Sequence, residues 1–108
     1  SVNDQIIHGV PSKKVILKDG DIVTIDLVIE KDGYHVDMAR TYEVGQNVSK
    51  NTKKLLEVTR NAFYEGIKFA KVGYRVGDIS HAIESYVQKN GFDVIVEYQG
   101  HGIRKKYA

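Results

Sequence analysis

The dipeptide Asp32-Gly33 lies between two runs rich in β-branched and aromatic residues, and this feature constrains the fold of the chain most. Both central residues of a type I′ turn have positive φ, so the dipeptide predicts a tight β-hairpin. We expect its strands to run from Asp21 to Glu30 and from Tyr34 to Glu43. If Asp32 and Gly33 are the loop residues, Lys31 faces Tyr34, and the residue numbers of every facing pair sum to 65.

Two aspartates share one face of this hairpin. Asp26 faces Ala39 and Val28 faces Asp37, so Asp26 and Asp37 are diagonal neighbours with Cβ atoms roughly 7 Å apart or less. A one-residue bulge would move one of them to the other face. The carboxylates repel, and Asp26 lies in the apolar run 22–29, where an unpaired charge is costly. A shared proton, a buried Lys or Arg, or a divalent cation would compensate them, so the pair is a candidate for half of a metal site.

Apolar residues at three- and four-residue steps predict two amphipathic helices. The first runs from about Ser49, a candidate N-cap, to Ala70, and the second opens at Asp78 and closes before Gly91. The run Phe92 to Tyr98 is expected to be a third strand that leads to the Gly100-His101-Gly102 segment. The predicted fold class is α+β, with an antiparallel hairpin or sheet packed against the two helices.

Composition indicates one small domain spanning residues 1–108, with 42% hydrophobic content and no cysteine for disulfides or thiolate ligands. No apolar run approaches the roughly 20 residues that cross a bilayer, and no charged-then-apolar leader begins the chain. The net charge of +2 and short, scattered basic clusters favour solvated surfaces over a specific nucleic-acid partner. We expect a cytoplasmic protein without a membrane partner.

Several motifs, in order and in register, resemble the type I methionine aminopeptidases over nearly the whole chain. They are Ser1-Val2-Asn3-Asp4, Ile7-His8-Gly9-Val10-Pro11, Lys18-Asp19-Gly20-Asp21-Ile22-Val23, Ile25-Asp26, Asp32-Gly33-Tyr34-His35, Asp37, Leu55-Leu56-Glu57-Val58-Thr59, Gly77-Asp78-Ile79, His81-Ala82-Ile83 and Gly100-His101-Gly102-Ile103. The resemblance implies about half of a "pita-bread" fold and an enzyme that removes the initiator methionine from nascent polypeptides, including at the ribosome.

The resemblance also implies a ligand set for two divalent ions, which Mn, Fe, Co and Zn all fit. Its two aspartates correspond to Asp26 and Asp37, its histidine ligand to His101, and its substrate-contacting histidine to His8. His35 shares the face of Asp37 and is a candidate to orient a metal ligand by hydrogen bonding to it. His81 adjoins the apolar stripe of the second helix and is expected to be structural.

The end of the chain departs from the family pattern. Arg104 stands where glycine is usual, Tyr107 keeps an aromatic that would wall the methionine pocket, and Ala108 falls where a second catalytic histidine is expected. The family's two glutamate ligands find no matching motif here. We therefore interpret the chain as a central fragment of the catalytic domain, truncated at both ends. It is expected to hold at most one weak metal site, to be inactive alone, and to self-associate through exposed sheet.

Two other functions remain open. One is a non-catalytic binding module of the same fold that recognises protein or RNA, which Arg104 and Ala108 favour. The other is an aminopeptidase related to the Xaa-Pro enzymes, which share the fold and the ligand set. The segment around His8 matches methionine aminopeptidases more closely.

Overall fold

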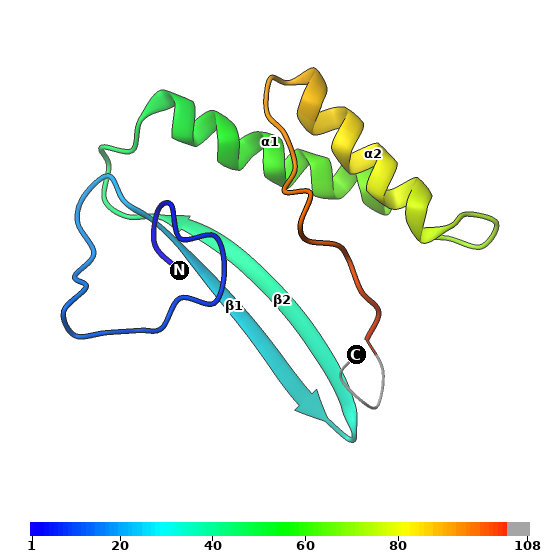
Figure 1. The fold of residues 1–108 in the computed structure, drawn as a ribbon, viewed down its shortest axis with the longest axis horizontal. Helices are drawn as coiled ribbons and strands as arrows, with labels where there is room; N and C mark the ends of the chain where they lie inside the picture. The colour runs from blue at the N-terminus through cyan, green and yellow to red at the C-terminus, as the bar shows by residue number, and fades with distance from the viewer. Residues whose placement is uncertain (104–108) are drawn as a thin grey trace. The chain divides into compact units, whose positions relative to one another are not determined.

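The computed structural model describes residues 1–103. Its elements are β1 (Ile22–Lys31), β2 (Tyr34–Glu43), α1 (Lys50–Ile67) and α2 (Val76–Lys89), coloured along the chain in Figure 1. They belong to two compact units, one of residues 1–49 with the segment from His101 onward, and one of residues 50–100. The α+β class predicted from the sequence is confirmed.

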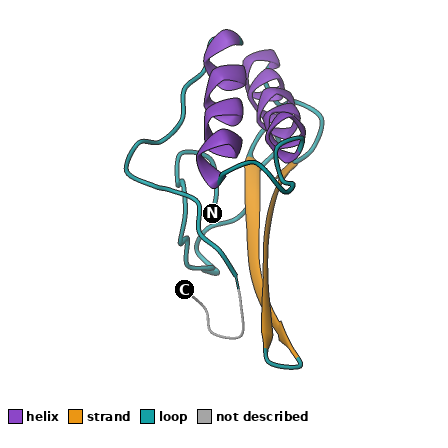
Figure 2. Ribbon diagram, turned by 90° about the vertical axis from the view of Figure 1, so that its right-hand side faces the viewer, coloured by secondary structure: helices purple, strands orange, loops and turns teal. Residues whose placement is uncertain are grey.

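The hairpin has the predicted register. β1 and β2 pair antiparallel from Ile22 opposite Glu43 to Lys31 opposite Tyr34 (Figure 2), and every facing pair sums to 65. Asp32 and Gly33 form the turn with φ of 53° and 80°, as a type I′ turn requires. No bulge interrupts the ladder, so alternate residues keep to their faces over its whole length.

The N-terminal residues lie along the free edge of β1. Val2 forms an isolated antiparallel bridge with Val23. The N–H of Thr24 donates to the Ser1 carbonyl at 2.8 Å, and the N–H of Asn3 donates to the Ile22 carbonyl at 3.0 Å. These bonds anchor the segment that leads to His8 beside the first half of β1.

The helical unit has its core between α1 and α2, which lie side by side in Figure 2. Val58, Ala62 and Val87 are buried there. α1 begins directly after Ser49, as predicted, and ends at Ile67 rather than Ala70. Its last turn tightens, because the N–H groups of residues 69 and 70 donate to carbonyls three residues back, at 3.0 Å each. Within the described residues, no helix is long and apolar enough to cross a membrane.

α2 begins two residues before the predicted start at Asp78. Asp78 instead sits in the first turn, where its carboxylate accepts the N–H of Arg75 at 2.7 Å. An acid is favoured at this position for two reasons. It accepts an N–H that would otherwise lack a partner, and its negative charge is attracted to the positive end of the helix dipole. Asp78 therefore predicted the N-terminal end of the helix to within two residues, but it is a residue of the first turn rather than the first residue of the helix.

The prediction of a third strand at Phe92 to Tyr98 is wrong, because these residues form no strand. Phe92 and Val94 pack against the core between the helices. Asp93 Oδ1 accepts the N–H of Val94 at 2.8 Å and the side chain of Gln88 at 3.2 Å. Such local side-chain bonds compete with the hydrogen bonds of a strand ladder. The alternating apolar residues here pack against the helices instead of forming a face of a sheet.

A clasp of hydrogen bonds joins the turn before β1 to the loop after β2. Asp19 Oδ1 accepts the N–H groups of Gln46 and Asn47, each at 3.0 Å, and the Asn47 side-chain amide donates to Asp19 Oδ2. Gly45, with φ of 72°, lies against this carboxylate, and an added Cβ would come within 2.1 Å of Asp19 Oδ1. The clasp therefore requires glycine at position 45.

Gly45→Ala is expected to lower the free energy of unfolding of the hairpin unit by more than the roughly 1 to 2 kcal/mol that a left-handed backbone costs a residue with a Cβ. The additional loss comes from the displaced hydrogen bonds of Asp19. Urea denaturation measures the loss. Gly33→Ala is the matched control, because Gly33 also has positive φ but nothing lies within 4 Å of its added Cβ. Equal losses for the two variants would show that the clasp contributes nothing.

The same clasp predicts a pH dependence of stability. The backbone N–H and the side-chain amide of Asn47 hold the pKa of Asp19 below its usual value of 3.8. Because the folded pKa lies below the unfolded one, the stabilisation is complete above pH 3.8 and is lost as the pH falls through the folded pKa. Urea midpoints measured from pH 5 downward are expected to fall less steeply for Asp19→Asn than for the wild type. Parallel curves would contradict this expectation.

Candidate metal centre

Asp26 and Asp37 lie where the predicted register puts them, with Asp26 opposite Ala39 and Asp37 opposite Val28. They are diagonal neighbours on one face, so a carboxylate of each strand can reach a common point above the hairpin. Asp26 is exposed and Asp37 is partly buried, with 22% of its side chain accessible. The apolar run around Asp26 predicted a costly burial of its charge. This prediction is wrong, because the Asp26 side chain is exposed to solvent.

His101 is the third candidate ligand, and it contacts one of the aspartates. Its Nε2 lies 3.5 Å from Asp37 Oδ2. Its Nδ1 is 3.1 Å from the carbonyl oxygen of Gly102, a contact that helps to orient the ring. Two residues 64 positions apart in the sequence thus meet on the hairpin face that carries Asp26 and Asp37, the carboxylate face.

His8 and Asp26 line one pocket of about 410 Å³. His8 has φ of 57°, an uncommon conformation for a residue with a side chain, and such strain gathers at functional sites. The next residue is held by a bond from the Gly9 N–H to Ser1 Oγ at 3.0 Å. The other residues of the pocket are Ser1, Gly9, Pro11, Val23, Thr24, Ile25 and Leu27.

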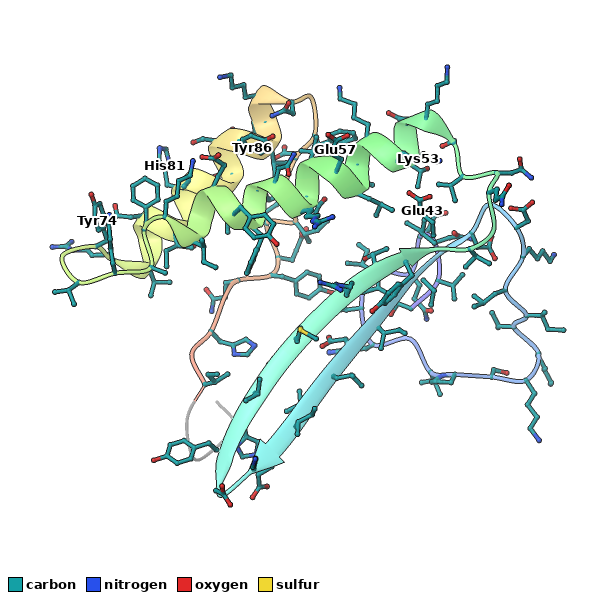
Figure 3. The ribbon with its side chains drawn as sticks, turned by 180° about the vertical axis from the view of Figure 1, so that it is seen from behind. Glu43, Lys53, Glu57, Tyr74, His81 and Tyr86 are labelled. Atoms are coloured by element: carbon teal, nitrogen blue, oxygen red, sulfur yellow. The ribbon has the colours of Figure 1, made fainter. Side chains whose placement is uncertain are left out.

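The remaining histidines are His35 and His81. His35 faces Glu30 in the ladder, and its Nε2 lies 3.8 Å from Glu30 Oε2, on the same face as Asp37. His81 is on α2 (Figure 3), with its Nε2 3.4 Å from Ser85 Oγ. His81 therefore belongs to the helical unit and not to the hairpin face.

Two contacts on the hairpin face were missed by sequence reasoning. They are the Glu30–His35 pair and a hydrogen bond between Thr24 Oγ1 and Thr41 Oγ1 at 2.8 Å. Both are facing pairs whose numbers sum to 65. The predicted register therefore already placed the two residues of each pair opposite one another.

The donor set suits a divalent cation. Two carboxylates and one imidazole are ligands that hard and borderline first-row metals accept. Within residues 1–103, no three such groups are close enough together to hold an ion, although Asp37 and His101 are in contact and Asp26 is the diagonal neighbour. Tyr107, the candidate pocket residue, and the divergent positions Arg104 and Ala108 lie outside the described residues.

A family model described as metallopeptidase family M24 matches residues 1–107. The chain belongs to this family. The M24 assignment confirms the resemblance seen in the motifs, and it accounts for an α+β segment of the pita-bread fold that carries paired aspartates. Membership of a metallopeptidase family implies the use of divalent metal.

Individual relatives support the same assignment. Methionine aminopeptidase 1 of Bacillus subtilis is 52% identical over 103 residues, which are 95% of this M24 chain and 41% of that protein. Methionine aminopeptidase of Borreliella burgdorferi is 50% identical over 103 residues, 95% of the chain and 40% of that protein. The crystal structure of methionine aminopeptidase from Rickettsia prowazekii has a TM-score of 0.91 and 40% identity, covering 98% of this chain and 42% of that one. The chain spans about two-fifths of the length of these relatives.

Proposed function

We propose that this chain is the part of a methionine aminopeptidase that supplies Asp26, Asp37 and His101 as metal ligands and His8 as a substrate contact. The observation that carries the proposal is the arrangement of two carboxylates on one hairpin face, with His101 Nε2 3.5 Å from Asp37 Oδ2. Residues 1–108 then form a central segment of a single catalytic domain. The parent enzyme removes the initiator methionine from new polypeptides.

Each side chain has a distinct role in this reaction. Asp37 lies next to both Asp26 and His101, and these three residues would hold divalent ions through carboxylate oxygens and an imidazole nitrogen. Ions held there would supply Lewis-acid chemistry, polarising a carbonyl and lowering the pKa of a water. His8, at the wall of the pocket beside Asp26, donates a hydrogen bond to the scissile amide and assists departure of the amine of the second residue. His35, held by Glu30, supports the carboxylate face.

The substrate is the N-terminus of a nascent polypeptide, met in the cytoplasm at or near the ribosome. Mn, Fe, Co and Zn all fit the ligands, and the complete domain holds two ions. These 108 residues, with three ligands of their own, bind one ion weakly and do not turn over peptide. Tyr107 forms part of the methionine pocket in this proposal.

A graft tests the proposal. Residues 1–103 replace the matching segment of the Bacillus subtilis relative, so that the host supplies the rest of the domain. The graft is expected to release methionine from a Met-Ala-Ser peptide and to lose at least about 100-fold of that activity in the Asp26→Asn variant, more than loss of an outer-shell partner costs. A folded graft that leaves the peptide intact would overturn the proposal. Cleavage of Xaa-Pro peptides instead would assign the chain to the related proline-specific enzymes.

The isolated chain also self-associates in this proposal. The hairpin face opposite Asp26 is apolar and exposed, with 48% to 62% of each of Ile25, Leu27, Ile29, Val36 and Met38 accessible. An apolar face of this kind favours association with a second copy. Sedimentation velocity is expected to show species larger than a monomer, and Leu27→Lys is expected to remove them. A wild type that is monomeric at all concentrations would contradict the expectation.

A further inference from the structure

A pair of threonine hydroxyls lies on the carboxylate face. Thr24 and Thr41 form the next facing pair along this face from Asp26 and Ala39. Thr24 Oγ1 and Thr41 Oγ1 are 2.8 Å apart and partly buried. Thr24 also lines the pocket that contains His8 and Asp26. Its backbone exchanges two bonds with Ser1, at 2.8 and 3.0 Å, so Thr24 is fixed through its main chain as well as its side chain.

The two hydroxyls carry one hydrogen more than their mutual bond consumes. Each threonine has one donor and two acceptor sites, and the Thr24–Thr41 bond uses a single donor. In the part of the chain that the structure describes, the hydroxyl groups of Thr24 and Thr41 have no other hydrogen-bond partner. One donor of the pair is thus available to a neighbouring acceptor.

Asp26 is the anion placed to receive it. Ala39, which faces Asp26, carries only a methyl group and therefore offers Asp26 no hydrogen bond from its side chain. Thr41 and Asp37 flank Ala39 on the same face, so Asp26 has one of them as a diagonal neighbour on each side. A carboxylate accepts a charge-assisted bond from a hydroxyl with one oxygen and keeps the other for a cation.

We propose that Thr24 and Thr41 are positioning residues for Asp26. Their free hydroxyl hydrogen reaches one Asp26 oxygen through one bridging water and holds the side chain in a single rotamer. The other oxygen is left available to the ion that Asp26 would hold, a step that rests on the ligand role proposed above for Asp26. The plain alternative is that facing threonines only stabilise the sheet, as such cross-strand pairs often do.

Metal-free NMR separates these two roles. Three-bond couplings to Asp26 Cγ report its χ1 in the 108-residue chain. One rotamer is expected in the wild type and rotamer averaging in Thr24→Val/Thr41→Val, which is isosteric but lacks both hydroxyls. Thr24→Ser/Thr41→Ser, which keeps both hydroxyls, is expected to recover one rotamer. Thr59→Val is the matched control, because the Thr59 hydroxyl bonds the Leu55 carbonyl on α1 at 2.7 Å, in the other unit. Averaging in the wild type, or one rotamer in Thr24→Val/Thr41→Val, overturns the proposal.

Mn²⁺ titration followed by electron paramagnetic resonance gives the second readout. Thr24→Val/Thr41→Val is expected to weaken binding by about 10- to 100-fold, the usual cost of losing a ligand's supporting bond. Thr24→Ser/Thr41→Ser is expected to keep wild-type affinity, because it retains both hydroxyls. Wild-type affinity in Thr24→Val/Thr41→Val overturns the proposal. Mn²⁺ binding that survives Asp37→Ala refutes the metal assignment instead, and the rotamer measurement then decides the role of the threonines alone.

Discussion

Asp37→Ala is expected to abolish Mn²⁺ binding by the 108-residue chain. Asp37 is the diagonal neighbour of Asp26 and lies 3.5 Å from His101 Nε2, so it is the one candidate ligand next to both of the others. Loss of a partner that only supports a ligand costs about 10- to 100-fold in metal affinity, and loss of a ligand costs more than about 100-fold. For a weak site with three protein ligands, such a change removes measurable binding. Isothermal titration calorimetry with MnCl₂ measures it.

Asp32→Asn controls for the loss of one negative charge. Asp32 is an exposed residue of the hairpin turn with φ of 53°, a conformation that asparagine also adopts readily. If the cation is held by general attraction to the acidic residues of the hairpin, both variants weaken binding to a similar degree. If Asp37 is a ligand, Asp32→Asn binds Mn²⁺ nearly as the wild type does. An Asp37→Ala chain that still binds the ion would remove the basis for the proposed metal centre.

The position of the two aspartates was predictable because hairpin register is a local property. A two-residue loop with positive φ at both positions fixes which residues face one another, and Asp32-Gly33 supplied that loop. Once Lys31 faced Tyr34, the faces of Asp26 and Asp37 followed without knowledge of the rest of the chain. The same rule would also have placed Thr24 opposite Thr41.

The segment that ends at His101 was less predictable because its conformation depends on distant packing. Alternating apolar residues from Phe92 onward suited a strand equally well, but Phe92 and Val94 are taken up by the core between α1 and α2. Periodicity over so few residues does not separate these outcomes. That His101 meets Asp37 was expected only through the family resemblance, since no local rule joins residues so far apart in sequence.

His8→Asn is expected to lower kcat/KM of the graft by about 100- to 1,000-fold, within the range that a positioned acid–base group contributes. His8 shares a pocket with Asp26 and has a left-handed backbone with φ of 57°. Asparagine is among the residues that adopt this backbone readily, so the substitution removes the imidazole without straining the loop. Hydrolysis of Met-Ala-Ser measures the loss, and an unchanged urea midpoint verifies that the loop remains folded.

Metal binding separates His8 from the ligands. His8→Asn is expected to leave Mn²⁺ affinity unchanged, whereas Asp37→Ala removes it, because His8 acts on the substrate rather than on the ion. His81→Asn is the matched histidine control, since His81 lies on α2 beside Ser85 and has no part in the pocket. A similar loss of kcat/KM in both histidine variants would point to general damage. A loss of Mn²⁺ affinity in His8→Asn would make His8 a ligand, and the division of roles between the pocket wall and the carboxylate face would then be wrong.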